Sequence, residues 1–295
     1  MDTIESLQRK MNSAATLKEV VRTMKAIAAS NIVQFDNAAI ALEDYYHTVK
    51  LGLRAYFFGN PPTTARVGRI ESKGGVVGAI ILGADQGFVG QFNEAVADYA
   101  AEKLLGLTSG HIIWAVGERM REYLNDAGFV VERMFDMPST VQAITPLVGD
   151  LLLESEMRRS RNEIAELYIF YNQHVPEAVY KPHHERLLPL DEMWLKSIYE
   201  LPWPTQCLPE VSGVLDQTLL ALIHEYLFVS VFRACTQSMA TENACRLATT
   251  QRADEKIGET LRDLLRTMQD MRQNQIDAEL FDVVAGFETM VQTKS

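Results

Sequence analysis

Hydrophobic residues recur every three or four positions along the C-terminal stretch from residue 211 to 291. The stretch contains no proline and only three glycines. Because this spacing places the hydrophobic residues on one face of a helix, it predicts a single long helix. About 75 helical residues would extend roughly 110 Å, so the hydrophobic stripe needs a long partner. The stripe consists of Leu215, Leu219, Leu222, Tyr226, Cys235, Met239, Ile257, Leu261, Leu264, Met268, Met271, Leu280, Val283 and Phe287.

The N-terminal residues 4–58 show the same pattern, with no proline and a single glycine, Gly52. All ten prolines lie between Pro61 and Pro209. We therefore predict two long terminal helices that pair as an antiparallel coiled coil around an inserted domain. Two ordinary helical domains whose turns lack glycine and proline are the alternative. The N-terminal stripe consists of Leu17, Val21, Met24, Ala28, Ile32, Phe35, Ala38, Leu42, Tyr45, Val49 and Leu53.

The middle of the chain alternates between short apolar runs and helical patterns, which predicts an open, mostly parallel α/β sheet of Rossmann-like type. The expected domains are 1–58 and 211–295 for the coiled-coil helices and 59–210 for the inserted α/β domain. The expected strands are 76–82, 111–116, 129–134, 166–171 and a β segment near 180–188, and the expected helices begin near Phe92 and cover 118–125 and 141–158.

Charge and hydropathy narrow the function classes. The net charge of −11 argues against general nucleic-acid binding, although residues 1–35 carry five basic and three acidic side chains. The most apolar window, Leu219–Phe232, is interrupted by His224 and Glu225, so we expect no insertion into a membrane. Cys235 and Cys245 fall about 15 Å apart on one predicted helix, too far for a disulfide, and reduced thiols fit a cytoplasmic protein.

A glycine-rich turn follows the first expected strand, at Gly83, Gly87 and Gly90. In α/β domains such a turn often binds phosphate. The spacing here fits neither of the common phosphate-binding motifs, and Gln91 stands where a P-loop would need lysine. We therefore predict a structural turn with a positive φ at Gly87, and keep a nucleotide-binding enzyme as the alternative.

The sequence His183-His184-Glu185 is a second candidate, for a metal ion. Neighbouring residues on a strand point to opposite faces, so these residues would chelate poorly, and we expect no metal site. No spacing in the chain matches a known nucleophile or acid–base arrangement. We expect no catalytic residues and no cofactor.

Four segments resemble the gamma subunit of rotary F-type ATP synthases. The N-terminal signature of that family is similar to Thr16–Ser30, and its glycine turn is similar to Asp85–Gly90. Two C-terminal motifs of the family resemble Thr241–Leu247 and the residues between Arg272 and Gly286. The match covers both ends and the first strand-turn-helix, in the family's order, while residues 100–210 match only in expected architecture.

The resemblance implies a central rotor shaft that performs no chemistry itself. Its coiled coil would lie inside the ring of alpha and beta subunits, and its α/β domain would contact the epsilon subunit and the membrane c-ring. Proton or sodium flow would turn it during ATP synthesis, and hydrolysis would turn it in reverse. The expected location is peripheral, on the cytoplasmic face of a bacterial inner membrane.

The resemblance also implies contacts to the surrounding stator by Met24 and Lys25 in the first helix. In the last helix it implies contacts by Arg272, Gln273, Asp277 and Glu279. Asp277 stands where the family has threonine, and Gln86 where it has arginine, so the resemblance implies a divergent bacterial member. A coiled-coil stalk of a vacuolar-type ATPase is a further alternative, but that stalk lacks an inserted α/β domain.

Overall fold

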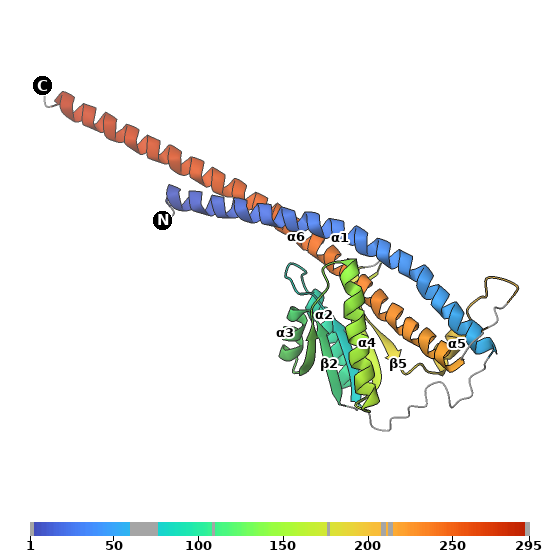
Figure 1. Ribbon diagram of the computed structural model, residues 1–295. Coiled ribbons are helices and arrows are strands. Elements are labelled where there is room, and N and C mark those ends of the chain that lie inside the picture. The colour runs from blue at the N-terminus through green and yellow to red at the C-terminus, as the bar shows by residue number, and fades with distance from the viewer. Residues whose placement is uncertain are drawn as a thin grey trace. The chain divides into compact units, whose positions relative to one another are not determined.

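The computed structural model describes residues 3–59, 76–107, 110–175, 178–207, 211 and 215–292 (Figure 1). The chain forms two compact units, residues 1–27 with 247–295, and residues 28–246. Two long helices, α1 (Ile4–Gly59) and α6 (Leu215–Gln292), each contribute to both units. The expected long terminal helices are thus confirmed.

The two helices pair antiparallel inside each unit. In the first unit Arg22 Nε donates to Asp254 Oδ1 over 3.4 Å, and α1 buries Val21. In the second unit the hydroxyl groups of Tyr46 and Tyr226 lie 3.3 Å apart. Residue numbers on α6 fall as those on α1 rise, which is the predicted direction of the coiled coil.

A five-stranded sheet in residues 28–246 has the order β3-β2-β1-β4-β5. Strands β1 to β4 are parallel, whereas β5 runs antiparallel to β4 at one edge. This confirms the mostly parallel sheet. The strands are β1 (Val76–Leu82), β2 (His111–Val116), β3 (Val131–Phe135), β4 (Ile164–Val175) and β5 (Ala178–Leu188).

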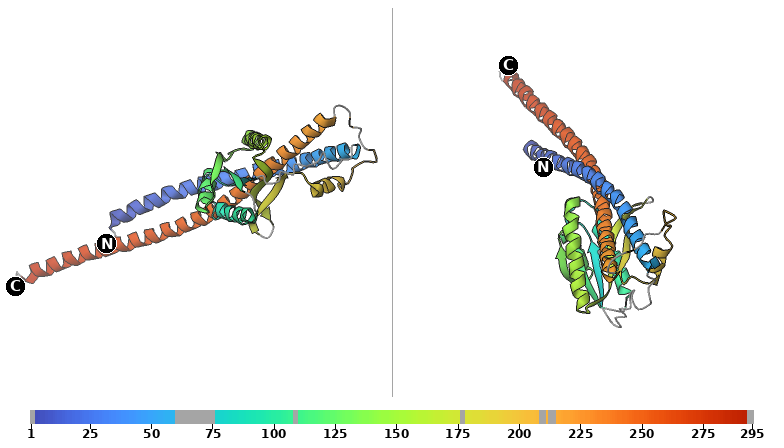
Figure 2. Two further views of the ribbon diagram at one scale, coloured as in Figure 1. Left: turned by 90° about the horizontal axis from the view of Figure 1, so that it is seen from below. Right: turned by 45° about the vertical axis from the view of Figure 1, so that its right-hand side comes forward.

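Helices cover both faces of this sheet (Figures 1 and 2). On one face, Ala79 and Ile81 of β1 pack with α2 (Phe92–Leu105) and α3 (Glu118–Asp126). On the other face, Ile80 and Leu82 share a larger core with α4 (Ile144–Ser160) and with the α1 and α6 residues of this unit. The alternation follows from the period of two along a strand.

Most predicted elements lie within a few residues of their expected bounds, and β1 and β2 coincide with them. Strand β4 is longer than expected because it continues to Val175 beside β5. The short helices η1 (Val141–Ala143) and α5 (Glu192–Tyr199) were not separately predicted. Helix α5 begins where the Asp191 side chain accepts a hydrogen bond from the Trp194 amide over 2.9 Å.

Among the described helices, α6 contains an 18-residue window with a mean hydropathy of 1.4, long and apolar enough to cross a membrane. A core helix can meet the same criterion, so this is weak evidence for a membrane span. In α6, Tyr226, Val229, Val231 and Ala234 belong to the core shared with the sheet. Packing inside the protein therefore accounts for these four positions, and 33% of the whole window is buried in this way.

Candidate functional site

The glycine turn after β1 is held by hydrogen bonds from its own backbone. The Gly83 amide donates to the Val116 carbonyl over 2.9 Å, and the Ala84 amide donates to Asn93 Oδ1 over 2.8 Å. The Asp85 carboxylate accepts from the Glu118 amide over 2.8 Å and so caps α3. A phosphate site needs free backbone amides at this position, and two of them are already used inside the protein.

The glycines of the turn have different roles from those predicted. The positive φ angles belong to Phe88, at 61°, and to Gly90, at 62°. The prediction of a positive φ at Gly87 is wrong, because the chain reverses one residue later than expected. Gly83 is the crowded position, since a Cβ there would lie 2.6 Å from Met120 Cβ. Gly83 thus allows β1 and α3 to approach closely.

Helix α6 closes the turn. Ala84, Val89 and Phe92 form a buried cluster with Cys245 of α6, and the Tyr180 ring lies edge-on to Phe92 with centroids 5.7 Å apart. In open α/β sheets, ligands usually bind beyond the carboxyl ends of the strands. Here the protein's own side chains pack against the segment that follows β1.

A buried ion pair lies on the same turn of α6. Arg246 Nη2 donates to Glu242 Oε1 over 2.6 Å, and Glu242 is only 6% exposed. Burial raises the pKa of Glu242, the positive charge of Arg246 lowers it, and the negative charge of Asp85 raises it. The net shift is upward. The two sequence segments that resembled family motifs, Asp85–Gly90 and Thr241–Leu247, therefore meet in space. No local pattern in the sequence predicts this contact.

The two histidines of β5 lie on opposite faces, as predicted. His184 Nδ1 is 2.8 Å from the Tyr99 hydroxyl of α2, and its ring stacks on Phe170. The His183 ring lies edge-on to Tyr171. Burial lowers the pKa of both histidines. Within the described residues, no group of three or more His, Cys, Asp or Glu side chains could hold a metal ion.

Lys25, one of the expected stator contacts, is engaged with α6. Its ammonium donates to Gln251 Oε1 over 2.5 Å and lies 3.9 Å from Asp254 Oδ2. Met24 is half-buried beside it. Lys25 therefore helps to join the two helices, and any contact of Met24 or Lys25 with another protein stays a prediction.

The four expected contact residues on α6 are exposed. Glu279 accepts a hydrogen bond from Gln275 over 3.3 Å, whereas the side chains of Arg272, Gln273 and Asp277 form no hydrogen bond or ion pair within the described residues. The same segment exposes Ile276, Leu280, Phe281, Val283 and Val284. It thus presents a mixed polar and apolar surface to a partner, and the roles of its residues stay predictions.

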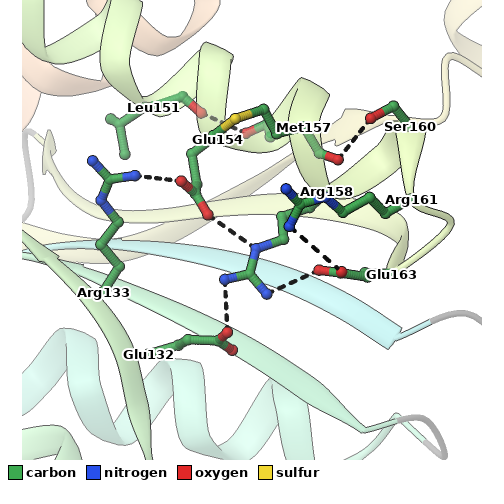
Figure 3. A network of polar contacts seen from close by, with 10 residues as sticks. Glu132, Arg133, Leu151, Glu154, Met157, Arg158, Ser160, Arg161 and Glu163 are labelled. Carbon is green, nitrogen blue, oxygen red and sulfur yellow. Dashed lines mark hydrogen bonds and ion pairs between the residues drawn. The ribbon is translucent and has the colours of Figure 1, made fainter.

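An ion-pair network joins α4 to the edge strand β3 (Figure 3). Glu154, which is 5% exposed, accepts hydrogen bonds from Arg133 and from Arg158 Nε, the latter over 2.9 Å. Arg158 also contacts Glu132 over 2.7 Å and Glu163 over 2.9 Å. Burial raises the pKa of Glu154, but the two arginines outweigh it and hold the pKa below its usual value. We call these five residues the Glu154 network.

Residues 3–290 match the family model described as ATP synthase. The gamma chains of Clavibacter michiganensis subsp. michiganensis and Syntrophus aciditrophicus are each 26% identical to this chain. The first alignment covers 97% of both proteins, and the second covers 99% of this chain and 100% of the relative.

Solved structures show the same fold. A chain of the Euglena gracilis mitochondrial ATP synthase, in an OSCP/F1/c-ring structure, has a TM-score of 0.66 at 14% identity and covers 99% of this chain and 96% of its own length. A chain of the Tetrahymena thermophila central stalk and c-ring has a TM-score of 0.56 at 16% identity, covering 79% and 99%. Since one family model accounts for almost the whole chain and its full-length relatives are gamma chains, the chain belongs to the ATP synthase gamma family.

Proposed function

We propose that this chain is the central rotor shaft of a rotary F-type ATP synthase. The observation that carries the proposal is the antiparallel pairing of α1 and α6, helices of 56 and 78 residues, within a family match over residues 3–290. A helix pair of this length suits the transmission of torque. The chain supplies no catalytic group. The turning surface of the shaft changes the catalytic sites of its neighbours.

The partners that fit this role are the alpha and beta subunits of the ring, the epsilon subunit and the membrane c-ring. As a subunit of a membrane-bound complex the chain is peripheral, and we place it on the cytoplasmic face of a bacterial inner membrane. Ion flow through the c-ring drives ATP synthesis, and hydrolysis drives the ions in reverse. This chain transmits rotation between the c-ring and the catalytic ring, and it takes no part in the chemical step itself.

The exposed end of α6 supplies the proposed stator contacts. Arg272 and Gln273 together offer as many as seven hydrogen-bond donors. A charge-assisted hydrogen bond is worth about 1.5–3 kcal/mol, enough to bias a step without locking it. Asp277 and Glu279 extend this polar surface. Met24 and Lys25 contribute from α1 near the Gln251 contact.

The rival functions have less support. A nucleotide-binding enzyme would need the turn after β1, where the amides of Gly83 and Ala84 donate to groups of the protein itself. A vacuolar-type stalk would lack the five-stranded sheet between the two helices.

The test is co-purification of the tagged full chain, followed by assay of the complex. We expect the alpha, beta and epsilon subunits to copurify and the complex to show ATP hydrolysis that pumps ions. A tagged chain that purifies alone and binds nucleotide with micromolar affinity would refute the proposal. A Gly87→Ala variant that kept its stability but lost such binding would support the enzyme instead.

A further inference from the structure

Arg233 of α6 forms an ion pair with Glu185 of the edge strand β5. The Arg233 Nη2 and Glu185 Oε2 atoms lie 2.9 Å apart, and each side chain is 21% exposed. The pair joins a terminal helix to the sheet, and these two elements lie far apart in the sequence. A charge-assisted hydrogen bond of this kind is directional, whereas the apolar contacts around it are not.

Helix α1 joins the same contact through Tyr46. The Arg233 guanidinium lies 4.7 Å from the centre of the Tyr46 ring, and the Lys50 ammonium lies 4.4 Å from it. The Tyr46 ring also stacks on Tyr226 of α6, with centroids 5.7 Å apart. We call these residues, Glu185, Arg233, Tyr46, Lys50 and Tyr226, the Arg233 cluster. Cation–π contacts of this geometry add to the attraction when they are partly desolvated.

The cluster therefore connects α1, α6 and β5 at one place. Turning the helix pair relative to the sheet would lengthen the Arg233–Glu185 contact. The Arg233–Tyr46 contact lies within the helix pair and would hold the guanidinium in place during such turning. The surrounding core, which includes Val229 and Ala234, is close-packed and also resists such turning. The Arg233–Glu185 pair adds a directional, charged contact between α6 and the sheet to this resistance.

We propose that the Arg233 cluster is the fastening that transmits torque between the sheet and the paired helices. The inference rests on the proposed rotor function and adds the residues that carry the load. Arg233 and Glu185 act as positioning residues, since they work through the elements that they join.

Two single variants and their combination distinguish a role of the ion pair in transmitting torque from a role in the stability of the fold. Glu185→Gln or Arg233→Met alone leaves a partly buried charge without its partner and destabilises the protein. The double variant removes both charges, and replacing a buried ion pair in this way is often neutral for stability. A control is Glu154→Gln with Arg133→Met, which removes the Arg133–Glu154 ion pair between β3 and α4 and also the Arg158–Glu154 ion pair within α4, and changes no residue of a terminal helix.

The measurement is the angular fluctuation of a bead on the rotor of the assembled complex, whose catalytic ring is fixed to a surface. A cysteine in place of the exposed Leu105 of α2, with Cys207 replaced by serine, provides an attachment point on the sheet side, because Cys235 and Cys245 are buried. Without ATP, the angular variance reports the torsional stiffness between ring and bead. With ATP, rotation of the wild-type complex tests the proposed function separately.

We expect the variance to rise in the Glu185→Gln, Arg233→Met double variant, because a directional contact between the helices and the sheet is lost, while thermal stability stays near wild type. The control variant should keep the wild-type variance. A wild-type variance in the double variant would overturn the inference even if the complex rotates. Failure of all three cluster variants to assemble would also overturn it, because the pair would then be a folding requirement.

Discussion

Replacing Gly83 by alanine tests the tight packing of the glycine turn. A Cβ at this position would lie 2.6 Å from Met120 Cβ, 2.7 Å from Met120 Cε and 3.0 Å from Asn93 Oδ1. Met120 is fully buried, and its Cβ is fixed by the backbone of α3. The first contact therefore cannot be relieved by a change of rotamer, and α3 must move away from β1.

The cost has two parts. Overpacking of this kind typically costs about 1–3 kcal/mol. If Asn93 turns away, the buried Ala84 amide loses its acceptor, at a further cost of about 1–3 kcal/mol. We expect Gly83→Ala to lower the free energy of opening by about 2–6 kcal/mol in total. Met120→Ala added to Gly83→Ala should restore little, because alanine keeps the Cβ that makes the closest contact.

Gly87→Ala is the matched control within the same turn. Its Cβ would meet the nearest atom, Arg119 Nη2, at an ordinary 3.6 Å. With no positive φ to strain, the substitution should change stability by less than about 1 kcal/mol and favour the folded state, since alanine restricts the unfolded chain.

Hydrogen exchange of the β1 amides in the full chain measures both effects, because it reports the free energy of local opening. Equal protection of β1 in the Gly83→Ala and Gly87→Ala variants would refute the packing argument. It would mean that β1 and α3 separate at no cost, and that the turn is not the close contact described above.

Three further predictions concern other parts of the chain. Arg272→Ala with Gln273→Ala should lower ATP turnover of the assembled complex about tenfold, the effect of one lost charge-assisted bond, without loss of assembly; unchanged turnover and pumping would show that shape alone acts there. Lys25→Glu should weaken the helix pair by no more than about 1 kcal/mol, through repulsion from Asp254, and salt should relieve the effect in denaturation experiments; a loss equal at low and high salt would contradict this. Because its folded pKa is held low, Glu154 stabilises the protein above the ordinary glutamate pKa of 4.5, and this contribution should fade as the pH falls below that value. Glu154→Gln should flatten the acid side of a stability profile, and an unchanged profile would assign acid sensitivity to other groups.

The sequence was informative where a local pattern decides the structure. Strands β1 and β2 are uninterrupted apolar runs that end at glycine, and their bounds follow from that pattern. Helix α5 is too short for a periodic pattern, and only its Asp191 cap marks it. Strand β4 continues through the polar Asn172 because that side chain is buried and donates to the Phe92 carbonyl over 2.8 Å. Such pairing depends on distant residues and leaves no local signal.

The site shows the same division. The motifs could be found in the sequence, but the contacts between them could not be predicted. The register between two helices depends on both helices and cannot be derived from the sequence of either one alone. Lys25 illustrates this, since its charge suggested a partner protein and its neighbour is Gln251 of the same chain. The prediction for the glycine turn was wrong at one residue. Whether Gly87 or Phe88 adopts the left-handed conformation depends on where α2 and α6 hold the chain.

The exposed last part of α6 affects the stability of the chain before it assembles with its partners. No side chain between residues 272 and 285 is buried. A helical segment of this length without tertiary contacts is only marginally stable in water. It should therefore unfold often enough to enter the active site of a protease, while an assembled copy would be shielded. The exposed end would then act as a degradation signal on unassembled copies. The amount of this chain would in this way follow the amount of its partners.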